Sequence, residues 1–278
     1  MFDSSSHAGS FPEQFRVKPG SSFRMDRIDP SATPGIDDKD RAREELAGLT
    51  KRLIHRQQLL YADNRQALLV VLQAMDTGGK DGTIRKVFGP LNPQGVRVCS
   101  FKSPSSEELA HDFLWRIHAN VPRKGMIRIF NRSHYEDVLV VRVHNLVPTE
   151  EVELRYSQIN EFEHYLSQNG ITILKFCLHI GKDEQKRRLE SRLERPEKNW
   201  KFSSADLAER QHWGEYQLAY QKALGACSTP WAPWHVIPSD HKWHRDYCVA
   251  RIVLEKLESM DLKFPDPQPG LDQIIIGD

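Results

Sequence analysis

Short runs of consecutive apolar residues alternate with longer segments of helical periodicity over most of the chain. The apolar runs cover residues 67–74, 96–101, 126–130, 171–180 and 234–238. Continuous runs of this length, with β-branched residues, are typical of strands buried on both faces of a sheet. Their alternation with helical segments predicts an α/β fold in which helices cover both sides of one parallel sheet.

The segments between these runs predict the main helices. From Asp38 onward, leucines recur at spacings of three and four, which predicts a helix packed on the sheet. A helix is also expected over residues 105–118, where Leu109, Phe113 and Ile117 lie on one face. Another is expected to begin with Thr149 as its capping residue.

Both ends of the chain lack such periodicity. Residues 1–37 are rich in Ser, Pro and Gly, so we expect an extended, partly disordered arm there. Residues 38–262 are expected to form a single domain, and residues 263–278 a tail.

Composition and charge narrow the class of protein. Hydrophobic residues make up 39% of the 278 residues and charged residues 28%, an ordinary globular balance. With a formal net charge of +1, a polyanionic partner would have to be held by local clusters of Lys and Arg. The four cysteines are scattered without metal-site spacing, and no apolar run reaches the roughly 20 residues of a membrane span. We therefore expect a cytoplasmic protein without a membrane or nucleic-acid partner.

A glycine-rich segment, AMDTGGKDGT, occupies residues 74–83 between the first predicted strand and a helical pattern. A turn of this kind directs backbone N–H groups into a cavity at a helix N-terminus, which suits phosphate oxygens. Lys80 adds a mobile positive charge. The segment therefore predicts a phosphate-binding loop, the alternative being a glycine-rich turn without a ligand.

The loop departs from the GxxxxGK[ST] pattern at two positions. Ala74 replaces the first glycine, and Asp81 replaces the hydroxyl that would bind Mg²⁺, which argues against standard ATP placement. Asp76 lies inside the loop, where a carboxylate is tolerable beside phosphates if it holds Mg²⁺ or orients an acceptor.

A second group of charged residues follows the third predicted strand, in FNRSHYEDVLVVRV (130–143). The carboxyl ends of strands line the ligand crevice of an open α/β sheet, so Arg132, Glu136 and Asp137 are expected to face the loop. An ion-paired loop on a solvated face is the alternative.

A third feature is the basic segment 182–203, which Pro196 should divide into separate helices. An arginine-rich lid could neutralise a polyphosphate chain and exclude water, whereas interleaved glutamates also permit a solvated, ion-paired helix. Lys102, Arg85 and Lys86 are further candidates for phosphate contact, or are ordinary surface cations.

Four segments, MDTGGKDGTI, SFKSPSSEELAHDFLWRIH, FNRSHYEDVLVVRV and ERPEKNWKFSSADLAERQHWGEY, together resemble the family-2 polyphosphate kinases. The resemblance covers about residues 40–262. It implies a three-layer, thymidylate-kinase-like P-loop kinase fold with a helical lid over about residues 182–205, Mg²⁺ as cofactor, and a homo-oligomer, either a dimer or a tetramer. It also implies reversible phosphoryl transfer between polyphosphate and adenine nucleotides.

The resemblance carries roles to individual residues. Asp76, Lys80, Arg132 and Asp137 are the expected catalytic residues, with Asp76 and Asp137 near the metal. The expected polyphosphate ligands are Thr77, Gly78, Gly79, Lys80, Asp81, Gly82, Thr83, Arg85, Lys86 and Lys102. The expected nucleotide ligands are Asn131, Arg132, Glu136, Asp137 and Arg142, and the expected lid residues are Arg188, Arg192, Arg195 and Lys198.

Within the family, the motif SHYEDV resembles that of the subclass that accepts both AMP and ADP. This resemblance makes Glu136 the expected determinant of specificity on the nucleotide side. Many members carry Asp-Arg where this chain has Asn131–Arg132, so Asp137 is expected to take the carboxylate role. An ATP-dependent nucleoside monophosphate kinase and a polyphosphate-binding regulator without turnover are the competing hypotheses.

Overall fold

A computed structural model describes residues 10–271 and 274–277 of the chain. The strands are β1 (Ala67–Gln73), β2 (Val96–Ser100), β3 (Ile127–Asn131), β4 (Ile171–His179) and β5 (Trp234–Pro238). All neighbouring strands are parallel, and the sheet has the order β2-β3-β1-β4-β5. The predicted positions of the strands and their parallel pairing are confirmed.

The helices cover both faces of the sheet. The longer ones are α1 (Lys39–Asp63), α6 (Thr149–Gln168), α7 (Lys182–Glu194), α9 (Ser204–Gln211), α10 (Trp213–Cys227) and α11 (Lys242–Ser259). The short ones are α2 (Lys80–Thr83), α3 (Ser106–Leu109), α4 (Trp115–His118), α5 (Val140–Val143), α8 (Pro196–Asn199), the 3₁₀ turns η1 (Phe11–Gln14), η2 (Met25–Arg27) and η4 (His134–Asp137), and the π-helical turn η3 (Ile84–Phe88).

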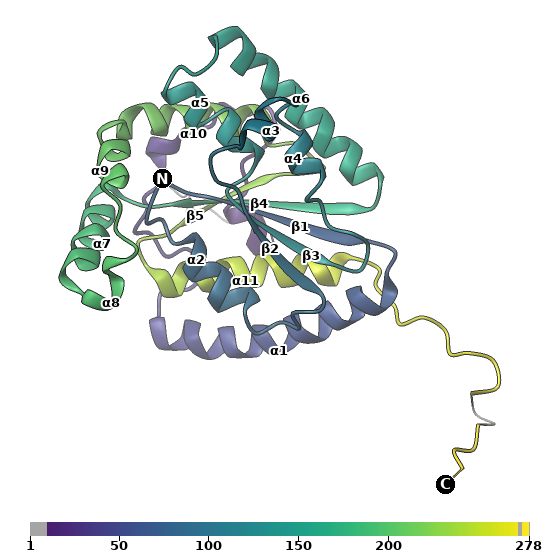
Figure 1. Ribbon diagram of the computed structural model, residues 1–278. Helices are drawn as coiled ribbons and strands as arrows, with labels where there is room; N and C mark the ends of the chain where they lie inside the picture. Colours follow the sequence, from purple (N-terminus) through teal and green to yellow (C-terminus); the bar gives the residue numbers. More distant parts are fainter. Residues whose placement is uncertain (1–9, 272–273, 278) are drawn as a thin grey trace.

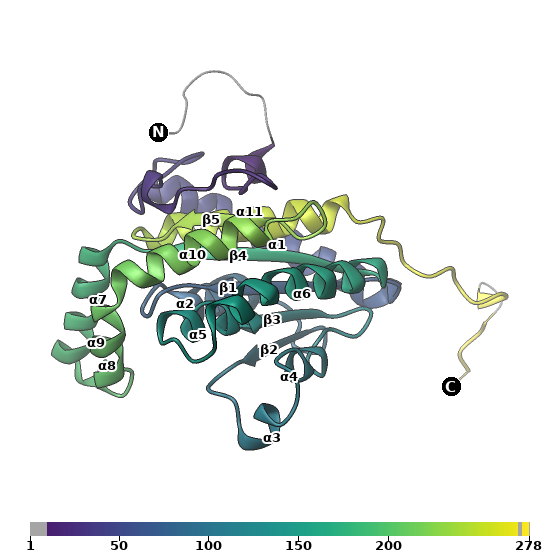
Figure 2. The same ribbon diagram turned by 90° about the horizontal axis from the view of Figure 1, so that it is seen from above.

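Two apolar clusters, one on each face, make the fold three-layered. Helices α1 and α11 pack on one face, whereas α6 and α10 cover the other (Figure 1). Every residue of β1 is buried, as its continuous apolar run predicts. This arrangement is the P-loop kinase fold expected from the sequence. Seen from above, α7, α8 and α9 project beyond one end of the sheet as a helical lid (Figure 2).

Local sequence signals set several of these boundaries. Asp38 caps α1, its side chain accepting a hydrogen bond from the Arg41 backbone N–H at 2.6 Å, and the buried Leu46, Leu53 and Leu60 mark one face of that helix. Pro196 separates α7 from α8, as predicted. No helix in the described ranges has the length and apolar character that crossing a membrane requires.

Two helical expectations were wrong. The segment over 105–118 forms two short helices, because the Asp112 carboxylate accepts a hydrogen bond from the Leu114 backbone N–H and the chain turns between them. Leu109, at the end of the first helix, is 70% exposed. Thr149 does not cap α6, since it is the first helical residue after Pro148.

The N-terminal segment packs on the body over its described part. Phe11 and Phe15 are buried against the α11 side of the sheet. Val17 donates its backbone N–H to the Trp234 carbonyl, and Phe15 accepts from Val236, so this segment runs along β5. The remainder of the predicted arm, residues 1–9, lies outside the described residues.

A buried polar network supports the turn after β3. Lys175 Nζ bonds the Tyr135 hydroxyl at 2.7 Å, the Glu163 carboxylate and the Cys227 carbonyl at 2.7 Å, and His134 contacts Glu163 at 3.2 Å. All the charged groups have partners, which keeps the cost of their burial low. The network therefore fixes His134 and Tyr135, which lie between the candidate site residues Arg132 and Glu136.

Candidate active site

The glycine-rich loop joins β1 to α2 at the carboxyl end of the sheet. Thr77 (φ 62°) and Gly79 (φ 108°) adopt left-handed backbone conformations. At Gly78, an added Cβ would lie 2.6 Å from the Ala74 Cβ, so only glycine fits. The loop curls tightly before α2 and leaves the first N–H groups of that helix for a ligand.

Lys80 lies over this loop. Its Nζ donates a hydrogen bond to the Ala74 carbonyl at 3.1 Å. Burial and, secondarily, the charge of Arg132 lower the pKa of Lys80, while Asp76 and Glu136 oppose that shift. The ammonium group therefore lies at the mouth of the loop among carboxylates, where an anion would stabilise its charged form.

Arg132 connects the loop with the turn after β3. It has a left-handed backbone (φ 63°), and its Nη2 lies 2.8 Å from Asp76 Oδ1 while its Nη1 lies 3.5 Å from Glu136 Oε2. Asp76, Arg132 and Glu136 line one small cavity together with Tyr216 and Tyr220 of α10. The structure thus brings together Asp76, Arg132 and Glu136, the residues predicted to act as the acid of the loop, the arginine of the second motif and the determinant on the nucleotide side.

The side chains of Asn131 and Thr83 each bond a neighbouring carboxylate. Asn131 Nδ2 donates to Asp81 Oδ1 at 2.8 Å, which ties the end of β3 to α2. The hydroxyl of Thr83 is buried and bonds Asp246 Oδ1 of α11 at 3.2 Å. The Thr83 side chain therefore anchors α2 to α11 and does not reach the phosphate side of the loop.

Asp137 was expected to lie near the metal with Asp76, but its contacts in the described residues are with two arginines and not with Asp76. Its carboxylate lies 3.9 Å from Arg116 and 3.7 Å from Arg155. In a 3₁₀ turn, successive side chains are rotated by about 120°, so when Glu136 faces Arg132, its neighbour Asp137 faces another side. Asp137 is absent from the residues that line the cavity beside Asp76.

The environment of Asp137 gives a testable dependence of stability on pH. Burial raises the pKa of Asp137 to about 6, although Arg116 and Arg155 oppose this shift. The folded protein therefore holds a proton that the unfolded chain loses near pH 4, and the free energy of unfolding falls by about 3 kcal/mol between roughly pH 4 and pH 6.

We expect Asp137→Asn to remove this pH dependence of the free energy of unfolding. Urea unfolding of both proteins from pH 4 to pH 8 measures it, since the variant should gain stability relative to the wild type as the pH rises. If the difference in stability between the variant and the wild type does not change with pH, titration of Asp137 is not the cause of the pH dependence.

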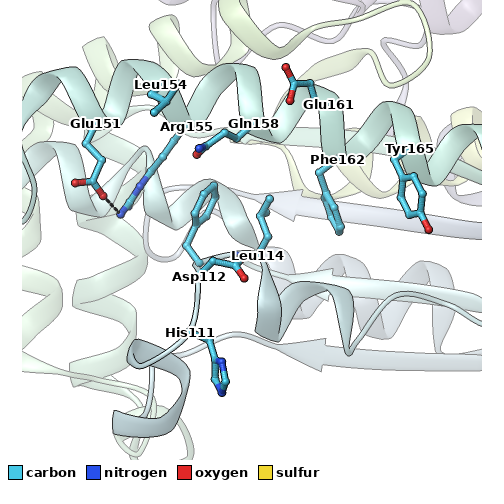
Figure 3. Close-up of a pocket in the computed structure, with 11 residues that line it drawn as sticks. His111, Asp112, Leu114, Glu151, Leu154, Arg155, Gln158, Glu161, Phe162 and Tyr165 are labelled. Carbon is cyan, nitrogen blue, oxygen red and sulfur yellow. Dashed lines mark hydrogen bonds and ion pairs between the residues drawn. The ribbon is translucent and has the colours of Figure 1, made fainter.

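A separate groove of about 710 Å³ lies between residues 111–114 and α6 (Figure 3). Arg155 lines it and bonds both Glu151, at 2.6 Å, and the Asp137 carbonyl, at 3.0 Å. Neither the residues of the phosphate-binding loop nor Asp137 itself line this groove.

The other predicted ligands are more dispersed. Arg142 bonds Glu153 at 2.8 Å and the Tyr156 hydroxyl at 3.4 Å, so its guanidinium is directed at α6 and not at Arg132. Arg85, Lys86 and Lys102 have exposed side chains.

The predicted lid arginines differ in their contacts. Arg188 donates to the Thr77 carbonyl at 2.9 Å and to the Ser239 carbonyl, which attaches α7 to the phosphate-binding loop. Arg192 pairs with Asp206 at 2.9 Å. Arg195 is exposed and Lys198 is half-buried. The lid is therefore joined to the site through Arg188, whereas Arg195 and Lys198 lie farther along it.

Sequence reasoning missed several residues beside the loop. Gln185 donates to the Asp76 carbonyl at 3.1 Å. The pKa of Asp206 is raised by burial and, next, by the charge of Asp76, so this lid carboxylate faces the same site. Glu209 lines the cavity beside Asp76.

Together, the parallel sheet, the cationic loop and the lid define a P-loop phosphotransferase. The family described as polyphosphate kinase 2 (PPK2) matches residues 36–265. By this match the chain belongs to the polyphosphate kinase 2 family.

Individual relatives agree with this assignment. The chain is 52% identical to the AMP/ADP-polyphosphate phosphotransferase of Meiothermus ruber, over 95% of this chain and 99% of that protein. It is 44% identical to the ADP-polyphosphate phosphotransferase of Rhodopseudomonas palustris, over 93% of each. The crystal structure of polyphosphate kinase 2 from Arthrobacter aurescens TC1 superposes with a TM-score of 0.92 at 43% identity, covering 96% of both chains.

Proposed function

We propose that this protein transfers a phosphoryl group reversibly from inorganic polyphosphate to AMP and to ADP, forming ADP and ATP. The observation that carries the proposal is the meeting of Lys80 and its loop with the Asp76–Arg132 pair at the carboxyl ends of β1 and β3. The similarity to the AMP/ADP-polyphosphate phosphotransferase of Meiothermus ruber supports the substrate assignment.

The residues suit a reaction that depends mainly on alignment and neutralisation of charge. Phosphoryl transfer passes through a loose transition state and needs little covalent help from the protein. The loop N–H groups and Lys80 hold the terminal phosphates of the donor. Arg132 neutralises the incoming phosphate of the nucleotide and keeps Asp76 oriented toward it. Because that phosphate is already ionised, no strong general base is required.

The nucleotide is proposed to enter beside Glu136. The adjoining cavity is lined by Tyr216 and Tyr220 and by Leu139 and Val140, a combination of aromatic and aliphatic surface next to a charged pair. Such surfaces suit contact with the part of the nucleotide next to its phosphate. The Lys175 network holds the turn that carries Glu136 in this position.

Mg²⁺ is the proposed cofactor, and the donor set fits it. Mg²⁺ is usually bound through one or two carboxylates together with substrate phosphates, not by a cage made only of protein groups. Asp76 of the loop and Asp206 of the lid would supply the carboxylates, in keeping with the raised pKa of Asp206 next to Asp76. No group of three or more His, Cys, Asp or Glu side chains able to hold a metal occurs in the described part of the chain. When bound, Mg²⁺ would neutralise negative charge on the transferring phosphates.

We further propose that the enzyme works in the cytoplasm as a dimer or a tetramer. Scattered reduced cysteines and nucleotide substrates support the compartment, and the family resemblance supports the oligomer.

The deciding experiment supplies purified protein with Mg²⁺, polyphosphate and either AMP or ADP, and measures ATP by luminescence after removal of contaminating adenylate kinase. Production of ATP from ADP establishes polyphosphate as donor, and production of ADP followed by ATP from AMP establishes the broader acceptor range. Transfer from ATP to AMP without polyphosphate would instead favour a nucleoside monophosphate kinase. Polyphosphate binding without turnover would favour the regulator.

A further inference from the structure

The last helix of the lid, α9, is held in place mainly by polar contacts. None of residues 204–211, all of which the structure describes, is buried, so little apolar packing fixes this helix. Figure 1 shows α9 beside α7 and α8, beyond the end of the sheet. Arg210 donates to the Lys182 carbonyl of α7 at 2.8 Å. Asp206 accepts a hydrogen bond from Arg192 of α7 at 2.9 Å. These two bonds join α9 to another part of the lid.

Glu209 connects α9 with the body of the protein. Its Oε2 lies 3.0 Å from Nε2 of His144, at the end of α5, and accepts a hydrogen bond from the Tyr216 hydroxyl of α10. An ionised carboxylate is an acceptor only, so His144 Nε2 and the Tyr216 hydroxyl are both donors. Burial alone would raise the pKa of Glu209, but the bonds from Tyr216 and His144 outweigh it and lower that pKa. A charged carboxylate of the lid is therefore held from two sides by the body.

The junction between α9 and α10 can act as a hinge for this contact. A single residue, His212, separates the last residue of α9 from the first residue of α10. Positions at the ends of helices commonly absorb the backbone rotation when a lid moves. Helix α10 is anchored by buried residues that include Tyr220 and Leu224. Rotation at His212 would thus separate Glu209 from His144 and leave most of α10 in place.

The cavity beside Asp76 is closed in this arrangement. Glu209 lines it together with Arg132 and Glu136, and its volume is about 20 Å³. One water molecule needs about 10–15 Å³, whereas pockets that enclose ligands usually have about 300–1,000 Å³. The cavity therefore has room for one or two water molecules and not for a nucleotide. Among the described residues that line it, Glu209 is the one that the lid contributes, so displacement of α9 would enlarge it.

We propose that His144, Glu209 and Tyr216 form a latch that keeps the nucleotide side of the site closed until an acceptor binds. This inference rests on the proposed function, which places the nucleotide beside Glu136. His144 is absent from the residues that line the cavity, so it is a positioning residue that acts through Glu209.

The latch sets the apparent affinity for the nucleotide. Opening it breaks the two hydrogen bonds of Glu209, and the nucleotide binds only the fraction of molecules in which they are broken. The apparent affinity is lower than the intrinsic affinity by that fraction. Binding of polyphosphate by the loop does not require this movement, because the loop lies outside the contacts of Glu209.

His144→Ala tests the latch, since its side chain is half-buried and lies outside the cavity. Backbone hydrogen exchange of the free protein, followed by mass spectrometry, should be about fivefold faster in α9 than in the wild type, as for loss of one hydrogen bond. Calorimetric titration with Mg²⁺ and ADP should give a Kd about fivefold lower than that of the wild type. The Kd for long-chain polyphosphate should change less than about twofold.

Three further variants make the test specific. His144→Gln places an amide N–H near the position of the ring Nε2 and should return both the exchange and the Kd for ADP toward the wild type. Tyr216→Phe removes the other donor but keeps the ring, and should also speed exchange in α9, which provides a second test if His144→Ala does not fold. His55→Ala, at an exposed histidine of α1, is the matched control and should change neither quantity.

Unchanged exchange in α9 in both His144→Ala and Tyr216→Phe would overturn the latch. Faster exchange without tighter binding of ADP would show that α9 does not govern the nucleotide side, and the inference would equally be wrong. If the wild-type protein binds neither AMP nor ADP, the proposed function fails, whereas the exchange of α9 still decides whether the latch exists.

Discussion

Lys80→Ala is expected to reduce kcat for transfer from polyphosphate to ADP by at least about 10³-fold. The ammonium group bonds the Ala74 carbonyl at the loop, and a preorganised charge in a partly desolvated site typically contributes a factor of about 10²–10³ or more. Loss of the charge also leaves Asp76 and the donor phosphates with less compensation. Initial rates with ADP and long-chain polyphosphate measure the effect.

Lys80→Arg separates charge from geometry and should recover only a small part of the rate, since a planar guanidinium cannot occupy the space of an ammonium above Ala74. Lys51→Ala, an exposed lysine on α1, is the control for loss of charge alone and should behave as the wild type. Near-normal activity in Lys80→Ala would refute the phosphate role of the loop.

Asp76→Asn is expected to lower kcat by about 10²–10³-fold and to raise the Mg²⁺ concentration needed for half-maximal rate. Asparagine preserves the shape but removes the charge that pairs with Arg132 at 2.8 Å and that would hold the metal. A titration of rate against Mg²⁺ at saturating ADP and polyphosphate measures both effects.

The same titration distinguishes between the two carboxylates that the sequence suggested. Asp137→Asn should leave the Mg²⁺ dependence unchanged, because Asp137 lies between Arg116 and Arg155. Asp206→Asn should shift it in the same direction as Asp76→Asn, though less. If Asp137→Asn alters the Mg²⁺ requirement and Asp76→Asn does not, our assignment of the metal ligands is wrong.

The fold could be predicted because its strong signals are local. A strand buried on both faces requires a continuous apolar run, so β1 and β4 were evident from sequence. The loop was evident because glycines with Lys80 must follow such a strand. The pairing of Asp76 with Arg132 also followed, since the carboxyl ends of adjacent parallel strands lie together.

Features that depend on tertiary contacts or on local turn geometry could not be predicted. Nothing in the sequence indicates that η4 is a 3₁₀ turn, yet that geometry turns Asp137 away from Asp76. Arg245 is distant from the loop in sequence, and only folding brings its guanidinium against Gly79. Phe11 and Phe15 are separated by polar residues and give no periodic pattern, although the folded body buries both.

The backbone contacts of Phe15 and Val17 with β5 have a consequence for how this protein avoids self-association. An uncovered outer strand offers free N–H and C=O groups to strands of other molecules and can start aggregation. Here the N-terminal segment occupies part of that outer edge. At the opposite edge, β2 has no such cover in the described chain and instead exposes the charged side chain of Arg97. The two borders of the sheet are thus shielded differently, one by the protein's own backbone and the other by charge. Shortening the chain at its beginning would remove the first kind of protection, even though every residue of the active site would remain.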